Sequence, residues 1–243
     1  MLDNLIGGRW HPPESGIYLD LCRDPDCSKP SVCVARSASD DVEHAVEAAQ
    51  FALCHWRDLD RAERQSLVAQ IPTLIQERRM DHWLDQCCTR LTGAKAVAAV
   101  AVDAFREEFV AVLNQSLTTQ ENAASEQQAE PNPPAIKCII ISAASSPTTG
   151  LASVFRALID GSTVVVAALY STRKQTAARL PSMLCAVAGC LPAGVINILM
   201  GLGLEVGVPL TRAHRGIGES REIPHSLSPV PLTRAAPLMA RTS

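Results

Sequence analysis

The sequence predicts an α/β protein, built as an incomplete doubly wound parallel sheet with a helical layer from its N-terminal part. Two observations support this prediction. Between residues 136 and 200, short aliphatic runs alternate with helical patterns, which is typical of parallel strands joined by right-handed crossovers. A glycine-rich turn, GLGLEVG at residues 201–207, follows the last of these strands. Glycines directly after a strand let the backbone approach a ligand closely, and a dinucleotide is the usual ligand.

The composition sets limits on the core and on the partners. The chain has 243 residues, of which 47% are apolar and only 4% aromatic, so we expect a largely aliphatic core. A net charge of −3 argues against nucleic acid or an anionic membrane surface as partner. No apolar run reaches the roughly 18 residues of a membrane span. We therefore expect a soluble, cytoplasmic protein.

The cysteines predict no metal site. There are nine of them, an odd number with scattered spacing and without any Cys-x-x-Cys pair. The early group, Cys22, Cys27 and Cys33, lacks a histidine at ligand spacing. Free thiols in a reducing compartment explain this pattern best.

The N-terminal elements follow from turn and capping signals. Residues 5–35 carry extended runs separated by turn residues, which predicts strands. A helix is expected from about Ser39, because Asp40 and Asp41 favour its positive end and apolar residues then recur with helical period. Asp60 with Glu63 predicts the start of a second helix. Pro72 lies inside this helix, at a cost of about 3 kcal/mol.

The remaining chain divides into a linker, an alternating segment and a tail. Helical patterns cover 81–91 and 94–113, and the polar residues up to Pro134 predict a mobile linker. Strands are then expected at 136–142, 162–168 and 194–200, with helices at 148–159 and 171–188, the second kinked at Pro181. The predicted units are residues 1–114 (hairpin and helical layer), 115–135 (linker), 136–207 (βαβαβ segment) and 208–243 (disordered tail).

Several segments, in this order, resemble the N-terminal half of an NAD(P)-dependent aldehyde dehydrogenase. The resemblance covers about residues 4–207. It rests on IGGRW at 6–10, DVEHAVEAA at 41–49, RAER at 61–64, RALIDGSTVV at 156–165, LPAGVIN at 191–197 and the glycine turn at 201–207.

This resemblance implies NAD or NADP as cofactor, with Ser142, Gly203 and Gly207 at the contact. The two glycines correspond to backbone positions that approach the adenosine end of the cofactor in the family. Ser142 opens the turn after the first cofactor strand, where the family places an asparagine that holds the developing oxyanion. Here that turn reads SAASSP, so this amide donor is missing.

Other departures imply weak or lost cofactor binding and no catalytic residues of its own. Ala167, Ala168 and Leu169 replace the family's Lys-Pro-Ser, which binds the adenosine ribose, and REIPH at 221–225 replaces a Phe-Thr-Gly-Ser segment. The half that carries the family's nucleophilic cysteine and its glutamate base is missing. Each lost hydrogen bond to a charged group costs about 1.5–3 kcal/mol, so two losses weaken binding by a factor of about 10²–10⁴.

Three functional hypotheses follow. The first is a degenerate, truncated homologue without its own catalysis, which acts through a full-length aldehyde dehydrogenase homologue or through self-association at an exposed sheet edge. The second is an active oxidoreductase that acts on aldehydes with NAD(P). The third is a non-functional truncated gene product, suggested by the hexapeptide VPLTRA, which occurs at 208–213 and again at 230–235.

Overall fold

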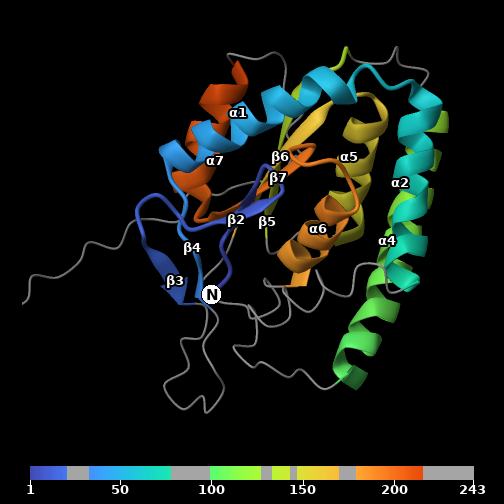
Figure 1. Ribbon diagram of the computed structural model, residues 1–243, viewed down its shortest axis with the longest axis horizontal. Coiled ribbons are helices and arrows are strands. Elements are labelled where there is room, and N and C mark those ends of the chain that lie inside the picture. The colour runs from blue at the N-terminus through green and yellow to red at the C-terminus, as the bar shows by residue number, and fades with distance from the viewer. Residues whose placement is uncertain (21–32, 78–98, 127–132, 143–146, 170–178, 216–243) are drawn as a thin grey trace, which may run out of the picture.

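A five-stranded mixed sheet forms the centre of the fold, with strand order β2-β1-β7-β6-β5 (Figure 1). The computed structural model describes residues 1–20, 33–77, 99–126, 133–142, 147–169 and 179–215. Strands β5, β6 and β7 are parallel to one another, as the alternating pattern predicted. Strand β1 pairs antiparallel with β7 and with β2. The five strands are β1 (Asn4–Ile6), β2 (Arg9–His11), β5 (Ile136–Ser142), β6 (Thr163–Leu169) and β7 (Ile196–Gly201).

The antiparallel part of the sheet comes from the N-terminal hairpin. Gly7 and Gly8 connect β1 to β2 with φ angles of 58° and 75°. Two consecutive residues with positive φ form the tight turn whose twist matches a hairpin, and glycine adopts this conformation without strain. The hairpin then pairs through Leu5 with Ile198 of β7. A separate small sheet joins β3 (Tyr18–Asp20) to β4 (Cys33–Ala35).

Helices cover both faces of the sheet (Figure 1). On one face, α1 (Ser39–Trp56) and α7 (Gly203–Arg215) pack together over the strands. On the other face lie α5 (Pro147–Ile159) and α6 (Arg179–Gly189), and α2 (Arg61–Gln76) and α4 (Ala99–Glu126) pack outside α5. Strands β6 and β7 are buried almost throughout, which explains their continuous apolar sequence.

The predicted helix starts are confirmed. The carboxylate of Asp41 accepts the N–H of Ala38 at 2.9 Å, just before α1. At α2, Asp60 accepts the N–H of Glu63 and Glu63 accepts the N–H of Asp60, which is a complete capping box. Helix α2 also runs through Pro72, which is buried.

Helix α4 continues to Glu126 and therefore includes residues 115–126, which we predicted as part of a linker. Buried Ser116 donates its hydroxyl to the carbonyl of Val112 at 2.7 Å, and Thr118 and Thr119 make similar bonds one turn back. These three hydroxyl groups bond to carbonyl groups of the helix itself, and the helix continues through this polar stretch.

Of the helix predicted at 171–188, the structure describes α6 from Arg179 on, and residues 170–178, which precede Pro181, lie outside the described ranges. One further expectation changes at the C-terminal side. Helix α7 extends to Arg215 and thus includes residues 208–215 of the predicted disordered tail, because Val206 and Leu210 are buried against the core. The predicted helix at 81–91 and residues 216–243 lie outside the described ranges.

A buried arginine joins α2 to the C-terminal end of α5 and to the α1–α2 turn. Arg64 of α2 donates its Nε to the carbonyl of Ile159, the last residue of α5, at 3.0 Å. Its Nη1 also donates to the carbonyl of Leu59 in the α1–α2 turn. Nearby, exposed Arg61 forms an ion pair with Asp160 at 3.0 Å. The carbonyl groups that a helix end leaves unpaired thus meet a cation.

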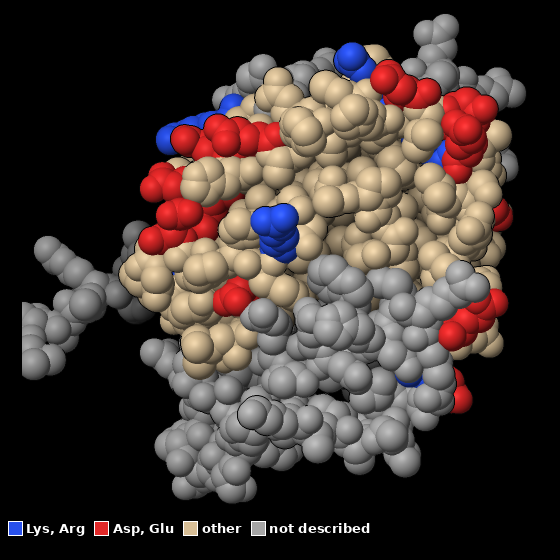
Figure 2. All heavy atoms as spheres, viewed as in Figure 1, with Lys and Arg blue, Asp and Glu red and all other residues tan. Residues whose placement is uncertain are grey.

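Acidic side chains cluster in two regions of the surface. Figure 2 shows that Asp and Glu gather over α1 and over the turn into α2, while the surface between them carries few charges. On α1 the exposed acidic side chains are those of Asp40, Glu43 and Glu47. In the described part of the chain, no helix is both long enough and apolar enough to cross a membrane.

Candidate functional site

The three parallel strands end level with one another. In the register of the sheet, Ser142 of β5 is opposite Leu169 of β6, and Leu169 is opposite Gly201 of β7. The carboxyl ends of parallel strands are where open α/β sheets bind ligands. The structure therefore brings the predicted site residue Ser142 to the same edge as the glycine turn. Residues 143–146, which complete the predicted turn after Ser142, lie outside the described residues.

The two predicted glycines lie on α7 above the ends of β6 and β5. A β-carbon added at Gly203 would lie 3.6 Å from Leu169 Cδ1, and one added at Gly207 would lie 3.6 Å from Ile140 Cδ1. Both are ordinary contact distances, so packing requires glycine at neither position. Gly203 is exposed, whereas Gly207 is buried against β5. Of the two, Gly203 presents its backbone more openly at the strand ends.

Gly201 has a different role, which our sequence analysis missed. A β-carbon at this position would lie 2.5 Å from Val206 Cγ2 and 3.4 Å from the backbone nitrogen of Ser37. A side chain there would force the buried side chain of Val206 to shift. The first glycine of the run is therefore required by the fold, and its place directly at the strand end was the signal in the sequence.

The end of β6 is apolar. Ala167 and Ala168 are buried in the sheet, and partly buried Leu169 follows, with its side chain beneath Gly203. This is the segment where the resemblance implied a lysine that donates to the ribose. An aliphatic side chain offers no hydrogen bond, so this part of the edge can contact a ligand only through apolar atoms and backbone.

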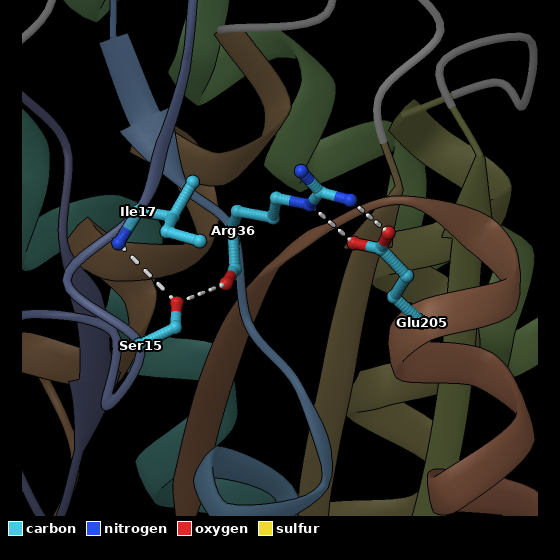
Figure 3. A network of polar contacts seen from close by, with 4 residues as sticks. All are labelled: Ser15, Ile17, Arg36 and Glu205. Atoms are coloured by element: carbon cyan, nitrogen blue, oxygen red, sulfur yellow. Dashed lines mark hydrogen bonds and ion pairs between the residues drawn. The ribbon is translucent and has the colours of Figure 1, made fainter.

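An ion pair holds the first turn of α7 to the segment that follows β4 (Figure 3). Arg36 donates its Nε to Glu205 Oε2 at 2.7 Å and its Nη2 to Glu205 Oε1. The hydrogen bond to Arg36 lowers the pKa of Glu205, and the same contact raises the pKa of Arg36. Ser15 extends the network, because its hydroxyl donates to the carbonyl of Arg36 at 3.4 Å and accepts the N–H of Ile17 at 3.2 Å.

This pairing also escaped the sequence analysis. Arg36 and Glu205 are 169 residues apart, so no local pattern links them. A carboxylate in the first turn of a helix is favoured by the helix dipole, and the arginine fork adds two charge-assisted hydrogen bonds. The carboxylate of Glu205, in the glycine turn, is therefore already paired with Arg36 within the protein.

A buried polar network fixes the residue before the turn. The side-chain Oδ1 of Asn4 accepts the N–H of Met200 at 3.0 Å and the hydroxyl of Ser37 at 2.7 Å. Asn4 donates its Nδ2 to Asp41 Oδ1 at 3.1 Å, and the N–H of Ser37 bonds the carbonyl of Met200 at 3.0 Å. The position of the glycine turn thus depends on N-terminal residues that our prediction did not include.

Five of the nine cysteines lie in the described residues, namely Cys33, Cys54, Cys138, Cys185 and Cys190. Burial raises the pKa of Cys138 and of Cys190 to about 12, so both sulfurs stay protonated at neutral pH. Cys185 is buried in the core and Cys54 is exposed on α1. Within the described ranges, no group of three or more His, Cys, Asp or Glu residues could hold a metal ion.

Comparisons with known proteins agree on one family. The model of the Aldehyde dehydrogenase family matches residues 19–218. Aldehyde dehydrogenases from Vibrio cholerae and Deinococcus radiodurans are 31% and 30% identical to the chain, over 233 and 224 residues. Each match covers 88% of this chain but only 42% and 41% of those proteins. The chain therefore spans about two fifths of the length of the curated relatives it matches.

Solved structures show the same partial overlap. An NAD⁺ complex of an aldehyde dehydrogenase from Bacillus cereus superposes with a TM-score of 0.58 at 21% identity, covering 90% of this chain and 45% of that one. Aldehyde dehydrogenase C of Pseudomonas syringae, a C291A mutant with NAD⁺ and octanal, has a TM-score of 0.57 at 22% identity, covering 86% and 42%. At these identities the likeness concerns the fold.

Proposed function

Since the chain belongs to the aldehyde dehydrogenase family, we propose that its 243 residues form a cofactor-domain-like unit that does not oxidise aldehydes by itself. The family reaction turns an aldehyde into a carboxylic acid. It needs a thiolate nucleophile, an oxyanion donor, a base and a nicotinamide that accepts hydride. No residue of this sequence corresponds to the family's cysteine nucleophile or to its glutamate base, and burial opposes thiolate formation at Cys138 and Cys190.

The unit retains part of a dinucleotide site, at which we expect weak binding of NAD or NADP. The observation that carries this proposal is the level row of strand ends beside a glycine, Gly203, that the fold itself does not need. The backbone of Gly203, together with Ser142, would lie along the ligand, and a bound nicotinamide would supply hydride acceptance. The aliphatic segment 167–169, which stands where the family has Lys-Pro-Ser, opposes tight binding, because the loss of a charged hydrogen-bond donor costs about 1.5–3 kcal/mol.

The proposed role is association with a full-length aldehyde dehydrogenase. Such a role requires a stably folded unit, and the buried network around Asn4 and the aliphatic core stabilise the fold. The alternative, an active NAD(P)-dependent oxidoreductase, requires a reactive cysteine among these residues.

Calorimetric titration with NAD and with NADP tests the cofactor site, with the Vibrio cholerae enzyme as reference. We expect affinities about 10²–10⁴-fold weaker than those of the reference, from two lost hydrogen bonds. Incubation of the chain with aldehydes and NAD should give no NADH absorbance. NADH formation, or affinity within tenfold of the reference, would contradict the proposal. Co-purification with a full-length relative tests the partner role separately.

A further inference from the structure

Arg36 lies at the edge of the sheet where the cofactor site is proposed. The N–H of the next residue, Ser37, bonds the carbonyl of Met200 in β7 at 3.0 Å, so Arg36 stands beside the carboxyl end of that strand. Its side chain reaches Glu205, two residues after Gly203, in the first turn of α7 (Figure 3). Open α/β sheets bind their ligands at this edge, so the ion pair borders the region where a dinucleotide would lie.

The backbone and the side chain of Arg36 are both held in place. Its N–H donates to the carbonyl of Ile17 at 3.0 Å, and its carbonyl accepts the hydroxyl of Ser15 at 3.4 Å. Glu205 fixes the far end of the side chain, because its two carboxylate oxygens accept Nε and Nη2 of the guanidinium. A cation that is already fixed loses little conformational freedom when it meets a ligand, so the contact costs less entropy.

The guanidinium of Arg36 keeps donors for a second anion. The contact with Glu205 uses one N–H on Nε and one on Nη2, and other N–H groups of the guanidinium remain. Nη1 points away from Glu205 in Figure 3 and makes no hydrogen bond to the described residues. Nη1 and Nη2 together form a planar fork that matches two oxygens of a phosphate. The side chain is 40% exposed, so a ligand can reach this fork.

The residues assigned to the cofactor so far carry no positive charge. Ser142, Gly203 and Gly207 are uncharged, and residues 167–169 at the end of β6 are aliphatic. A dinucleotide is an anion, because its two nucleotides are joined by a diphosphate bridge, and NADP carries a further phosphate on its adenosine ribose. Arg36 supplies a cation beside the glycine turn, where such a ligand needs one.

We propose that Arg36 binds a phosphate group of the dinucleotide and that Glu205 holds the guanidinium in the orientation for this contact. The inference rests on the proposed cofactor site and adds to it the residue that meets the negative charge of the ligand.

The two charges of the pair act on a phosphate in opposite directions, and this makes the proposal testable. Arg36 attracts the phosphate, whereas the carboxylate of Glu205 repels it. A glutamine at position 205 removes the negative charge, but its amide oxygen can still accept a hydrogen bond from the guanidinium. The substitution Glu205→Gln therefore separates the orienting role of Glu205 from its charge.

Titration of the full chain with NAD and with NADP, followed by NMR, measures the affinities even when binding is weak. Arg36→Gln should weaken binding about tenfold or more, because a charge-assisted hydrogen bond is lost and Glu205 keeps its charge without a partner. Glu205→Gln should strengthen binding by about threefold, because the repelling charge is gone. Arg36→Lys keeps the charge without the planar fork, so its affinity should fall between those of wild type and Arg36→Gln.

Arg61→Gln is the matched control. Arg61 forms an ion pair with Asp160 at 3.0 Å, before the amino end of β6 and thus at the opposite edge of the sheet, so its loss should leave the affinity unchanged. Circular dichroism shows that each variant is folded. A purely structural ion pair would lower the affinity in both Arg36→Gln and Glu205→Gln, so opposite changes identify the ligand contact.

The two cofactors identify the phosphate. Equal effects on NAD and NADP indicate the diphosphate bridge, effects confined to NADP indicate the phosphate on its ribose, and both results support the proposal. The inference alone is overturned if the wild-type chain binds the dinucleotides and Arg36→Gln binds them as tightly, or if Glu205→Gln does not strengthen binding. A wild-type chain that binds neither dinucleotide overturns the cofactor site itself, and this contact with it.

Discussion

Replacing Gly207 with alanine should stabilise the protein. Gly207 is the fifth residue of α7, so an alanine there gains the helix preference of about 0.5–1 kcal/mol over glycine. The added methyl group would lie 3.6 Å from Ile140 Cδ1, which is contact without overlap. The φ angle of Gly207 is not positive, so the new side chain causes no backbone strain. We therefore expect the free energy of unfolding to rise by about 0.5–1 kcal/mol.

The same change at Gly201 should have the opposite sign. Its β-carbon would lie 2.5 Å from Val206 Cγ2, and overpacking of this kind costs about 1–3 kcal/mol. Urea unfolding followed by circular dichroism measures both variants, and an unchanged slope shows that the shift reflects stability. For a chain of this size, 1 kcal/mol moves the melting temperature by about 2–4 °C. A loss of stability in Gly207→Ala as large as that in Gly201→Ala would refute the placement of α7 on β5.

Three further results are expected. Arg64→Ala should lower the free energy of unfolding in urea by about 2–4 kcal/mol, because buried carbonyl groups lose their hydrogen-bond donor. Arg61→Ala removes only an exposed ion pair and should change the same free energy by about 0–1 kcal/mol. Equal effects of the two variants would contradict the structure. The pKa of Glu205 is lower in the folded protein than in the unfolded chain. Its contribution to stability is therefore fully present above the unfolded pKa of about 4.3 and disappears as the pH falls through the folded-state pKa. Glu205→Gln should therefore be less stable than wild type at pH 7 and match it in acid; a pH-independent difference would exclude this explanation. Under native conditions a thiol reagent should modify exposed Cys54 faster than partly buried Cys138, whose pKa is raised to about 12, as peptide mass spectrometry can check. Equally rapid modification of the two thiols would contradict this.

Local patterns in the sequence were sufficient for elements whose signals lie within a few residues. The alternation of apolar runs and helical patterns identified β5, β6 and β7 nearly to the residue. The Asp60 and Glu63 pair marked the start of α2, because a capping box closes over three residues. Composition was less informative: the polar residues after Asn114 suggested a linker, but their side chains bond within the helix and α4 continues.

By itself, the sequence determined the α/β class, the parallel pairing of three strands and the resemblance to the aldehyde dehydrogenases, all of which rest on periodicity and short motifs. Only the tertiary structure decided which cation meets Glu205 and which side chain holds Met200, because each partner comes from a segment more than 160 residues away. It also decided which glycine the fold requires, because Gly201 is confined by Val206 of α7 and by the backbone of Ser37 once these segments have packed together. The physical reason is one of range. Backbone preferences and helix caps act over a few residues, whereas contacts between distant segments exist only after all the layers have packed together.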